Sequence, residues 1–494
     1  MEKSENVKVV ITSVEEKDGR VSVKGSAVGL GAHRVEIMVN GDFNQRYVAD
    51  NDCDGNWVCE FPLNCNGEYR IEASVRDYSD FSKLRQPVPD ENYLVLDGVF
   101  VWGSTVVKHS DGLYYMIFAA WDEEVTFNNW HRYSELKYAV STKLFGPYVY
   151  MGGALDRSHD NIVGCKAPNW GNGVINVFHN PYLMHSKKDG KYYLYFMGTT
   201  TADCALSGRR QRIGVAVADH PAGPWRVSEK PVIDVREGYH DAVFVNNPSV
   251  VEIEEDGKYR YLGIYRANNP PVKVGGYATA EHPEGPFKQS EEPIMVNKDA
   301  DFAVEDFCLW QNGGKFYCLA KDMSKGDLTG YRDGYSYALF ESEDGEDWKL
   351  SKNNMAFPAV IPWESGEQVV ARLERTGLYI ENEVPLMMTN AVRTTMPSEH
   401  TGTFTSNIQT PLIGVELTKD EYLLKVGDLE EKSVDKSELC RLVKAAEAKK
   451  REDCKLDSWR KLLCALRAGK ILLGRESAEQ YDVDFAVNCL KNIL

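Results

Sequence analysis

Five short runs of the sequence carry polar side chains of the kinds that bind hydroxyl groups. They are residues 101–105, 178–181, 245–248, 304–307 and 373–376. Within them His179, Asn180, Asn246, Asn247 and Arg375 offer hydrogen-bond donors and acceptors. A ligand rich in hydroxyl groups would suit this set, because a few convergent polar groups fix the orientation of a small molecule in a pocket.

The same runs hold an aromatic ring and carboxylates. Trp102, Trp121 and Trp170 could each stack on a flat apolar ligand face or could belong to the core. Glu305 is a carboxyl group that could exchange a proton with a ligand or could be a channel carboxylate paired with Arg375 or Lys321, and Glu374 is a candidate binding residue. We also include Lys321 and Asp322 among the candidate binding residues.

The elements that must position these runs repeat along residues 90–415. A turn followed by an aromatic strand begins at Asp111-Gly112, Asp189-Gly190, Asp256-Gly257 and Gly313-Gly314. A second turn recurs at Gly146-Pro147-Tyr148, Gly223-Pro224-Trp225 and Gly285-Pro286-Phe287, and Asp344-Gly345 takes its place in the fourth copy. A fifth, fainter unit contains residues 373–388. Such units cannot bury their sheet faces alone, so we predict a five-bladed β-propeller whose innermost strands carry the polar runs.

The two flanks differ from this pattern. Residues 7–86 alternate apolar and polar side chains between turns such as Asn40-Gly41 and Asp54-Gly55, which predicts an antiparallel β-sandwich. Beyond residue 430 the apolar positions follow a helical period, which predicts a small bundle of three helices. The predicted fold class is thus mainly β, with domains at residues 1–87, 88–425 and 430–494.

Bulk composition narrows the partners. The net charge of −17 argues against nucleic acid. One basic stretch, residues 208–212, could hold an acidic sugar or could be a solvated turn. Eleven cysteines without zinc-like spacing favour reduced thiols over a disulfide framework. Residues 1–6 contain no apolar leader and no run is long enough for a membrane span, so we expect a cytoplasmic protein with no membrane partner, or a secreted one if a leader was removed.

The repeats resemble the five-bladed propellers of glycoside hydrolase families 43, 32 and 68. The chain is more similar still to a group of predicted glycosidases that carry four motifs, one in each of the first four units: Val101-Trp102-Gly103, His179-Asn180-Pro181, Asn247-Pro248-Ser249-Val250 and Glu305-Asp306. The N-terminal segment is similar to bacterial immunoglobulin-like modules, and the C-terminal segment resembles the three-helix FIVAR module. The resemblance implies a glycoside hydrolase that cleaves an oligosaccharide or polysaccharide in the central pocket.

The resemblance also implies catalytic residues. Glu305 corresponds to the acid that protonates the leaving oxygen, while Asp306 beside it is expected to face the opposite side of the strand. The chain departs from the family at two acids, where Ser104 and Asn247 stand. Asp241 is therefore our candidate for the second catalytic carboxylate, with Asp97 and Asp322 behind it.

Two other functions fit the same residues. The missing family acids favour a propeller that binds glycans without catalysis, and a glycosyl-transferring or phosphorolytic relative is a further alternative. The resemblance implies no required cofactor and leaves room for a calcium ion on the axis. The expected partner is a carbohydrate substrate, and the sequence does not define the oligomeric state.

Overall fold

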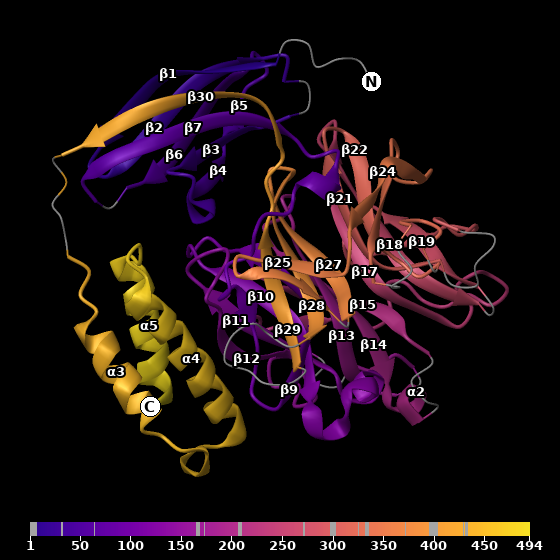
Figure 1. Ribbon diagram of the computed structural model, residues 1–494. Helices are drawn as coiled ribbons and strands as arrows, with labels where there is room; N and C mark the ends of the chain where they lie inside the picture. The colour runs from indigo at the N-terminus through magenta and orange to yellow at the C-terminus, as the bar shows by residue number, and fades with distance from the viewer. Residues whose placement is uncertain are drawn as a thin grey trace.

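The computed structural model describes residues 7–30, 33–63, 65–164, 168–171, 173–205, 210–269, 272–296, 303–324, 326–330, 335–370, 372–394, 404–427, 429 and 433–494. These residues form a β-sandwich, a larger propeller-like body of β-sheets and a group of three helices (Figure 1). Among them, no helix combines the length and the apolar composition of a membrane span.

The propeller-like body contains five four-stranded antiparallel sheets that follow one another along the chain. The first is β9 (Val99–Lys108), β10 (Tyr114–Asp122), β11 (Glu135–Ser141) and β12 (Val149–Leu155). The second is β13 (Ile175–His185), β14 (Tyr192–Thr200), β15 (Arg212–Ala218) and β16 (Arg226–Val227). The third is β17 (Phe244–Glu255), β18 (Lys258–Asn269), β19 (Val272–Ala280) and β20 (Lys288–Gln289).

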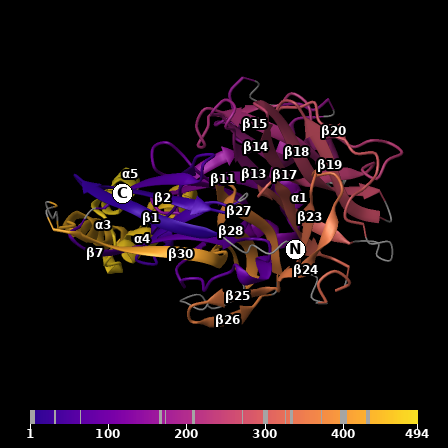
Figure 2. The ribbon, with the colours of Figure 1, turned by 90° about the horizontal axis from the view of Figure 1, so that it is seen from above.

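The fourth sheet is β21 (Val304–Asn312), β22 (Lys315–Asp322), β23 (Tyr337–Ser342) and β24 (Lys349–Phe357). The fifth is β27 (Arg372–Glu381), β28 (Val384–Thr394), β29 (Phe404–Pro411) and, from far earlier in the chain, β8 (Tyr93–Leu94). A hairpin of β25 (Val360–Trp363) and β26 (Gly366–Val369) precedes it. In Figure 2 this hairpin and β20 lie at the periphery, with β17 and β27 between them.

The first strands of the five sheets are β9, β13, β17, β21 and β27, and each contacts the next in this order. Because β27 also contacts β9, the five strands form a closed cycle. Pairing of β8 with β29 ties the start of the body to its end. The segment between β10 and β11 holds η3 (Glu123–Val125), η4 (Phe127–Asn129) and the short α1 (Trp130–Tyr133), and α2 (Thr201–Ala205) follows β14. The polar runs thus converge on one axis.

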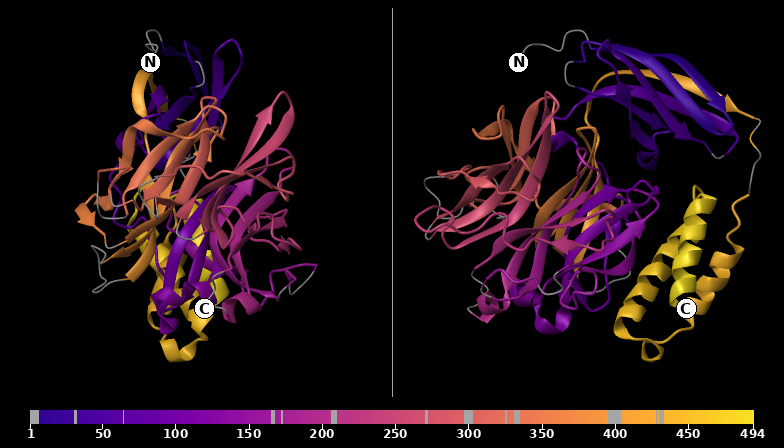
Figure 3. Two further views of the ribbon diagram at one scale, coloured as in Figure 1. Left: turned by 90° about the vertical axis from the view of Figure 1, so that its right-hand side faces the viewer. Right: turned by 180° about the vertical axis from the view of Figure 1, so that it is seen from behind.

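The N-terminal sandwich has two four-stranded sheets. One contains β1 (Lys8–Lys17), β2 (Arg20–Val28), β6 (Asn56–Pro62) and β5 (Asp50–Asn51). The other contains β30 (Val415–Val426), β7 (Gly67–Asp77), β3 (Val35–Val39) and β4 (Arg46–Val48), with η1 (Phe43–Gln45) between β3 and β4. Figures 1 and 3 show β30 returning from the propeller-like body to lie along the sandwich.

This return of the chain corrects the predicted boundary at residue 425. Residues 415–426 pair with β7 rather than with any sheet of the propeller-like body, and Leu424 and Val426 join the apolar core of the sandwich. Sequence alone could not reveal this, because a strand of alternating pattern carries no sign of which distant edge it will pair with.

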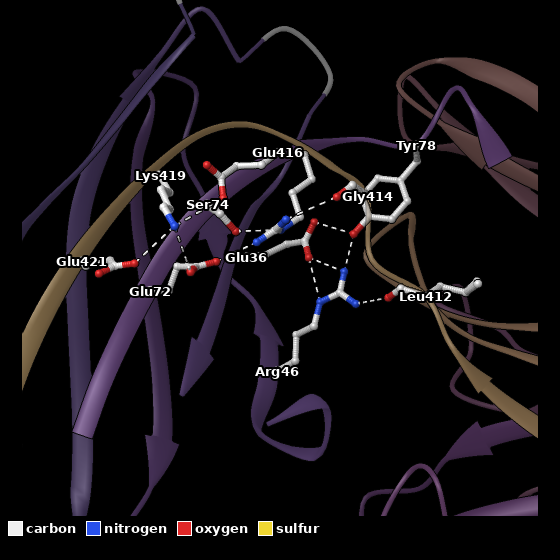
Figure 4. Close-up of polar contacts among 11 residues, drawn as sticks. Glu36, Arg46, Glu72, Ser74, Tyr78, Leu412, Gly414, Glu416, Lys419 and Glu421 are labelled. Carbon is white, nitrogen blue, oxygen red and sulfur yellow. Dashed lines mark hydrogen bonds and ion pairs between the residues drawn. The ribbon is translucent and has the colours of Figure 1, made fainter. Parts of the chain in front are cut away.

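A buried polar cluster joins the sandwich to the propeller-like body (Figure 4). The guanidinium of Arg46 donates to the carboxylate of Glu36, to the hydroxyl oxygen of Tyr78 and to the carbonyl oxygen of Leu412, just beyond β29. Tyr78 in turn donates to Glu36 over 2.7 Å. Because every partner is buried, loss of one member would leave a charge or donor unpaired.

The linker after β7 enters the apolar core. Phe81, in η2 (Phe81–Lys83), is fully buried against the rings of Trp310 and Phe357, and Leu84 is buried with them. We predicted a separate domain for residues 1–87, whereas the end of this segment lies in the core of the propeller-like body. The reason is that apolar side chains of the linker fill the space beside the fourth sheet.

The C-terminal group contains α3 (Ser437–Glu447), α4 (Leu456–Gly474) and α5 (Gln480–Ile493), with η5 (Arg451–Asp453) between the first two. Figure 3 shows it beside the propeller-like body. Helix α4 contacts β12, and Arg460 donates to the carbonyl oxygens of Asp97 and Gly98 and pairs with Asp122 at 2.6 Å. The predicted three helices are present, and they are docked on the first sheet.

Candidate functional site

A pocket of about 160 Å³ lies at the first halves of the five central strands. Its aromatic wall is Trp102, Trp121, Phe127, Trp130 and His179. Its amide side chains are Asn180, Asn246 and Asn247. Its charged side chains are Arg266, Glu305, Asp306, Arg372, Glu374 and Arg375. The volume is below the roughly 300–1,000 Å³ of ligand sites for larger molecules, so it suits a ligand the size of a single sugar ring.

An irregularity at the same place in each central strand builds the floor. The ladder shifts register there, and one residue adopts a positive φ: Gly103 at 28°, Asn180 at 49°, Asn247 at 53°, Asp306 at 57° and Arg375 at 49°. A bulge of this kind turns a side chain out of the regular alternation. The five residues therefore face the axis together.

Successive bulge residues contact one another around the axis. The amide nitrogen of Asn180 donates to Asn247, whose own amide nitrogen donates to Asp306 over 2.8 Å. The backbone N–H of Arg375 donates to Asp306 over 3.3 Å. A side chain on Gly103 would collide with Arg375, since an added Cβ would lie 2.9 Å from the Cβ of the arginine. Glycine is thus required at position 103.

Beneath the pocket, one fully buried lysine contacts three carboxylates. The ammonium nitrogen of Lys321 lies 2.5 Å from Glu305, 2.9 Å from Glu374 and 3.2 Å from Asp306. Burial opposes the charge on Lys321, but the three carboxylates raise its pKa well above the usual range. Likewise burial works against Asp306, yet Lys321 and Arg375 hold the pKa of its carboxyl below the usual value.

Glu305 and Glu374 differ in their surroundings. Both oxygens of Glu305 are in ion pairs. Oε1 lies 2.5 Å from Lys321, and Oε2 lies 2.7 Å from Arg266. Among the described residues, the ion pairs of Glu374 involve one oxygen, Oε1, which lies 2.9 Å from Lys321 and 3.8 Å from Arg372. Burial raises the pKa of Glu374, Lys321 opposes this shift, and the charges of Asp306 and Glu305 add to it, so that the pKa is raised. Glu374 is thus the carboxyl group at the pocket best suited to carry a proton.

The insert between β10 and β11 contributes Phe127 and Trp130 to the aromatic wall, and the other three rings come from β9, β10 and β13. Trp130 stacks on the ring of His179, with centroids 4.6 Å apart, and Trp121 meets that ring edge-on. Burial and the nearby Arg375 lower the pKa of His179 well below its usual range, so its ring is neutral. Its Nδ1 forms a 2.7 Å hydrogen bond with Ser134, which fixes its orientation.

Several polar atoms of the pocket residues are buried without a hydrogen-bond partner in the described part of the chain. They are the side-chain oxygens of Asn180 and Asn246 and the Nε and Nη1 atoms of Arg375. Buried polar atoms are normally paired, so these atoms mark places where a polar ligand or water would bind. The oxygens would accept from ligand hydroxyl groups, and the guanidinium would donate.

Most of the predicted binding residues come together at this pocket. Trp102, His179, Asn180, Asn246, Asn247, Glu305, Glu374 and Arg375 line it, and Lys321 lies below it. Trp170 does not; it stacks on Phe196 in the second sheet.

The structure does not bring Asp241 to the pocket. Its carboxylate is fully buried and pairs with Arg236 at 2.8 Å, while Tyr265 and Gln289 donate to it. It therefore braces the loop before β17 against the third sheet, and it cannot serve as the partner of Glu305 that we predicted.

Asp322 and Asp97 also lie outside the pocket lining. Both oxygens of Asp322 are used by the loop that follows it, since Ser324 and Thr329 donate to them through backbone and hydroxyl groups. Asp97 lies under α4. Asp322 thus shapes a loop instead of binding a ligand at this site.

Sequence reasoning missed three charged residues of the pocket. Asp306 was expected to face away from the axis, but the bulge turns it inward. Arg266 reaches the pocket from β18, a second strand, and Arg372 from the very start of β27. The recurrence of Asn, Asn, Asp and Arg at equivalent places in successive units was the available signal, because Asn and Asp tolerate a positive φ better than most residues.

Metal binding has two candidate places. On the axis, Asp306 is already engaged by two cations, so the bulge residues do not supply the set of oxygen ligands that calcium requires. Elsewhere in the described residues, His109, Asp111 and His220 bring ligand atoms within 4.8 Å of one another. There Nδ1 of His220 accepts the backbone N–H of Ala222, which places the proton on Nε2 and opposes metal binding through that atom.

The basic stretch of residues 208–212 is described only in part. Arg212 pairs with Asp203 at 2.8 Å and with Asp234 at 2.9 Å. Residues 206–209 lie outside the described residues. Arg212 is thus committed to a structural ion pair.

No protein-family model matches the chain, and no curated protein matches it. Among solved structures, a family 117 glycoside hydrolase of the marine bacterium Zobellia galactanivorans is similar at 18% identity, with 67% of this chain and 90% of that chain covered and a TM-score of 0.43. A thermostable family-43 glycoside hydrolase is similar at 14% identity, with 71% and 97% covered and a TM-score of 0.44. A levansucrase variant of B. megaterium is similar at 12% identity, with 70% and 94% covered and a TM-score of 0.46.

Proposed function

We propose that the chain is a glycoside hydrolase whose five sheets are the blades of a propeller and whose central pocket binds and cleaves a terminal sugar. The observation that carries this proposal is a pair of carboxyl groups at one small pocket, of which Glu305 pairs with two cations and Glu374 has a raised pKa. Glycoside hydrolysis requires two carboxyl groups in such different states. The reaction needs no metal or cofactor.

Glu374 donates a proton to the leaving oxygen as the glycosidic bond breaks, and the carboxylate of Glu305 attacks the sugar carbon to form a covalent intermediate. Water then cleaves this intermediate while Glu374 accepts the proton of the water. Oε1 of Glu305 lies 2.5 Å from the ammonium nitrogen of Lys321, and Oε1 of Glu374 lies 2.9 Å from the same nitrogen. These two oxygens are therefore no more than about 5.4 Å apart. This upper limit is below the roughly 6.5–9.5 Å of inverting enzymes, so the pair leaves too little room for the water of an inverting mechanism, which favours retention. The aromatic wall would stack on the sugar ring, and the free amide oxygens would accept from its hydroxyl groups.

The flanking modules complete the proposal. We assign the sandwich to the immunoglobulin-like type and the helices to the FIVAR-like type, on their sequence resemblance. Neither module contributes a residue to the pocket lining. Their role is structural support of the propeller.

Substitution of the two glutamates separates their roles and tests the proposal. Glu374→Gln should reduce kcat/KM on a natural oligosaccharide by about 10²–10⁴-fold, and much less on an aryl glycoside whose leaving group needs no proton. Glu305→Gln should reduce both rates alike. The exposed Glu343, which pairs with Lys315 on the surface, provides the control variant Glu343→Gln.

If Glu305→Gln shows the substrate-dependent loss and Glu374→Gln does not, Glu305 is the donor, as the sequence resemblance implied. Full activity of both variants would contradict hydrolysis at this pocket.

A propeller that binds glycans without cleaving them is the second candidate function. One observation favours it: both oxygens of Glu305 are occupied by ion pairs, which restrains the carboxylate from attacking a substrate. Calorimetry that detects glycan binding, together with no product after prolonged incubation, would establish this alternative.

A further inference from the structure

One guanidinium at the pocket has unused hydrogen-bonding capacity. Arg375 is only 6% exposed, and its Nε and Nη1 atoms have no hydrogen-bond partner among the described residues. The nearest carboxylate oxygen, on Asp306, lies 3.6 Å from Nη1, beyond hydrogen-bond distance. An arginine buried this deeply is normally paired.

The neighbouring acid cannot satisfy Arg375, because its oxygens already have other partners. Oδ1 of Asp306 accepts from Asn247, and Oδ2 is approached by Lys321 and by the backbone N–H of Arg375 itself. The donors of the guanidinium therefore remain available to something that enters the pocket.

A second arginine lies three residues earlier on the same strand. Arg372 lies 3.8 Å from an oxygen of Glu374 that Lys321 already contacts at 2.9 Å, and its guanidinium lies over the ring of Phe127. Its side chain is about one third exposed. Arg372 is thus held loosely at the rim, while Arg375 is fixed at the floor.

The charges of the pocket also favour an anion. Four cations, those of Arg266, Lys321, Arg372 and Arg375, surround three carboxyl groups, although the molecule as a whole carries −17. An excess of positive charge at one small pocket of an acidic protein is not explained by general surface charge. Guanidinium groups bind planar or tetrahedral oxyanions through paired hydrogen bonds.

We propose that the pocket selects a sugar that bears an oxyanion group, a carboxylate or a sulfate ester, and that Arg375 binds this group. The inference rests on the proposed function, since it names the substrate class of the same pocket. The sugar hydroxyl groups bind to the free oxygens of Asn180 and Asn246, the ring stacks on the tryptophan wall, and the oxyanion occupies the unused donors of Arg375. Arg375 is then the residue that determines specificity.

Calorimetry with the full-length protein tests the proposal. The probes are glucuronate and galacturonate, their neutral counterparts glucose and galactose, a sulfated galactose and inorganic phosphate. We expect the anionic sugars to bind about 10–100-fold more tightly than the neutral ones, as charge-assisted hydrogen bonds predict. Comparison of the uronates with the sulfated sugar identifies which oxyanion the pocket prefers.

Variants then assign the preference to Arg375. Arg375→Gln should abolish the preference for anionic sugars and retain weak binding of neutral ones, and Arg375→Lys should keep part of it, because the charge remains and the paired geometry is lost. Arg260→Gln, on the same strand as Arg266 but in a surface ion pair, should bind as the wild type does. Circular dichroism tests whether each variant is folded. If Arg375→Gln does not fold, the comparison of uronate with neutral sugar in the wild-type protein still tests whether the pocket prefers anionic sugars.

Each contrary result has a distinct meaning. Equal binding of neutral and anionic sugars would overturn this inference and leave the proposed hydrolase intact. Failure of every sugar to bind would overturn the proposed function itself. Tight binding of inorganic phosphate, with sugar phosphate as the product of cleavage, would overturn the anionic-sugar assignment in favour of phosphorolysis.

Discussion

At the scale of single residues, the pocket depends on one lysine. Three carboxyl groups would repel one another at these distances without the cation of Lys321 between them. The sequence showed Glu305, Glu374 and Lys321 as candidates, but not that one nitrogen contacts both glutamates. Asp241 could not be excluded from sequence, because its partners Tyr265 and Gln289 come from strands β18 and β20, which only the fold brings beside it.

Removal of this lysine should destabilise the protein strongly. Lys321→Met should lower the free energy of unfolding by about 3–5 kcal/mol, since it leaves buried carboxylates without their shared counter-ion. Lys315→Met, in an exposed ion pair on the same strand, should change it by less than about 1 kcal/mol. Urea unfolding measures both, and equal effects of the two variants would contradict the central role of Lys321.

The raised pKa of Glu374 predicts a pH-dependent gain in stability when it is replaced. The folded protein binds this proton more firmly than the unfolded chain does, so the contribution of Glu374 is complete below the usual pKa of glutamate and is lost as pH rises through the raised value. Glu374→Gln should therefore have a higher Tm than the wild type at neutral pH, and the gain should disappear at acidic pH. A gain that is the same at every pH would show that ionisation of Glu374 is not its cause.

At the scale of elements, the repeated turns and aromatic strands predicted the four-stranded units well. Alternation along a strand predicted which side chains share a face, and it failed only at the bulges, where Asp306 turns toward the axis. A bulge is set by the contacts between neighbouring sheets, which a pattern within one strand does not contain.

Two substitutions at one bulge separate its backbone from its side chain. Asn247→Ala removes the amide that links Asn180 to Asp306 and places alanine at a φ of 53°. Asn247→Gly removes the same amide but suits that conformation. We expect both to destabilise the protein, and the alanine variant by about 1 kcal/mol more. Thermal unfolding of the pair measures the difference, and equal Tm values would show that the backbone at this bulge is not strained.

At the scale of the whole molecule, the three parts are more interdependent than their sequence patterns indicated. Each part has its own periodicity, which made the three classes of structure predictable. The contacts between the parts involve the linker residue Phe81, the returning strand β30 and Arg460 on α4. These depend on side chains with no periodic pattern, and so the sequence did not reveal them.

Truncation tests this interdependence. The fragment of residues 88–425, which the sequence alone suggested as a folded unit, lacks Phe81 and Leu84 and carries most of β30 without its partner β7. We expect it to aggregate or to melt without a cooperative transition, whereas residues 79–414 should remain more soluble because they keep the linker and omit the orphaned strand. Light scattering and calorimetry compare the two. A well-folded 88–425 fragment would show that the linker contributes little to the core.

The return of β30 to the sandwich sets an order of events during synthesis. The edge of β7 is complete at Asp77, but its partner begins only at Val415, with 337 residues between them. At ~5–20 residues per second the ribosome needs roughly 17–70 s to supply that partner. Throughout this interval the growing chain carries an unpaired strand edge, a surface that pairs readily with other chains. Most strands of the N-terminal sandwich are therefore synthesised first, but its last strand, β30, is synthesised only after the propeller-like body. The nascent protein needs protection at the edge of β7 until then.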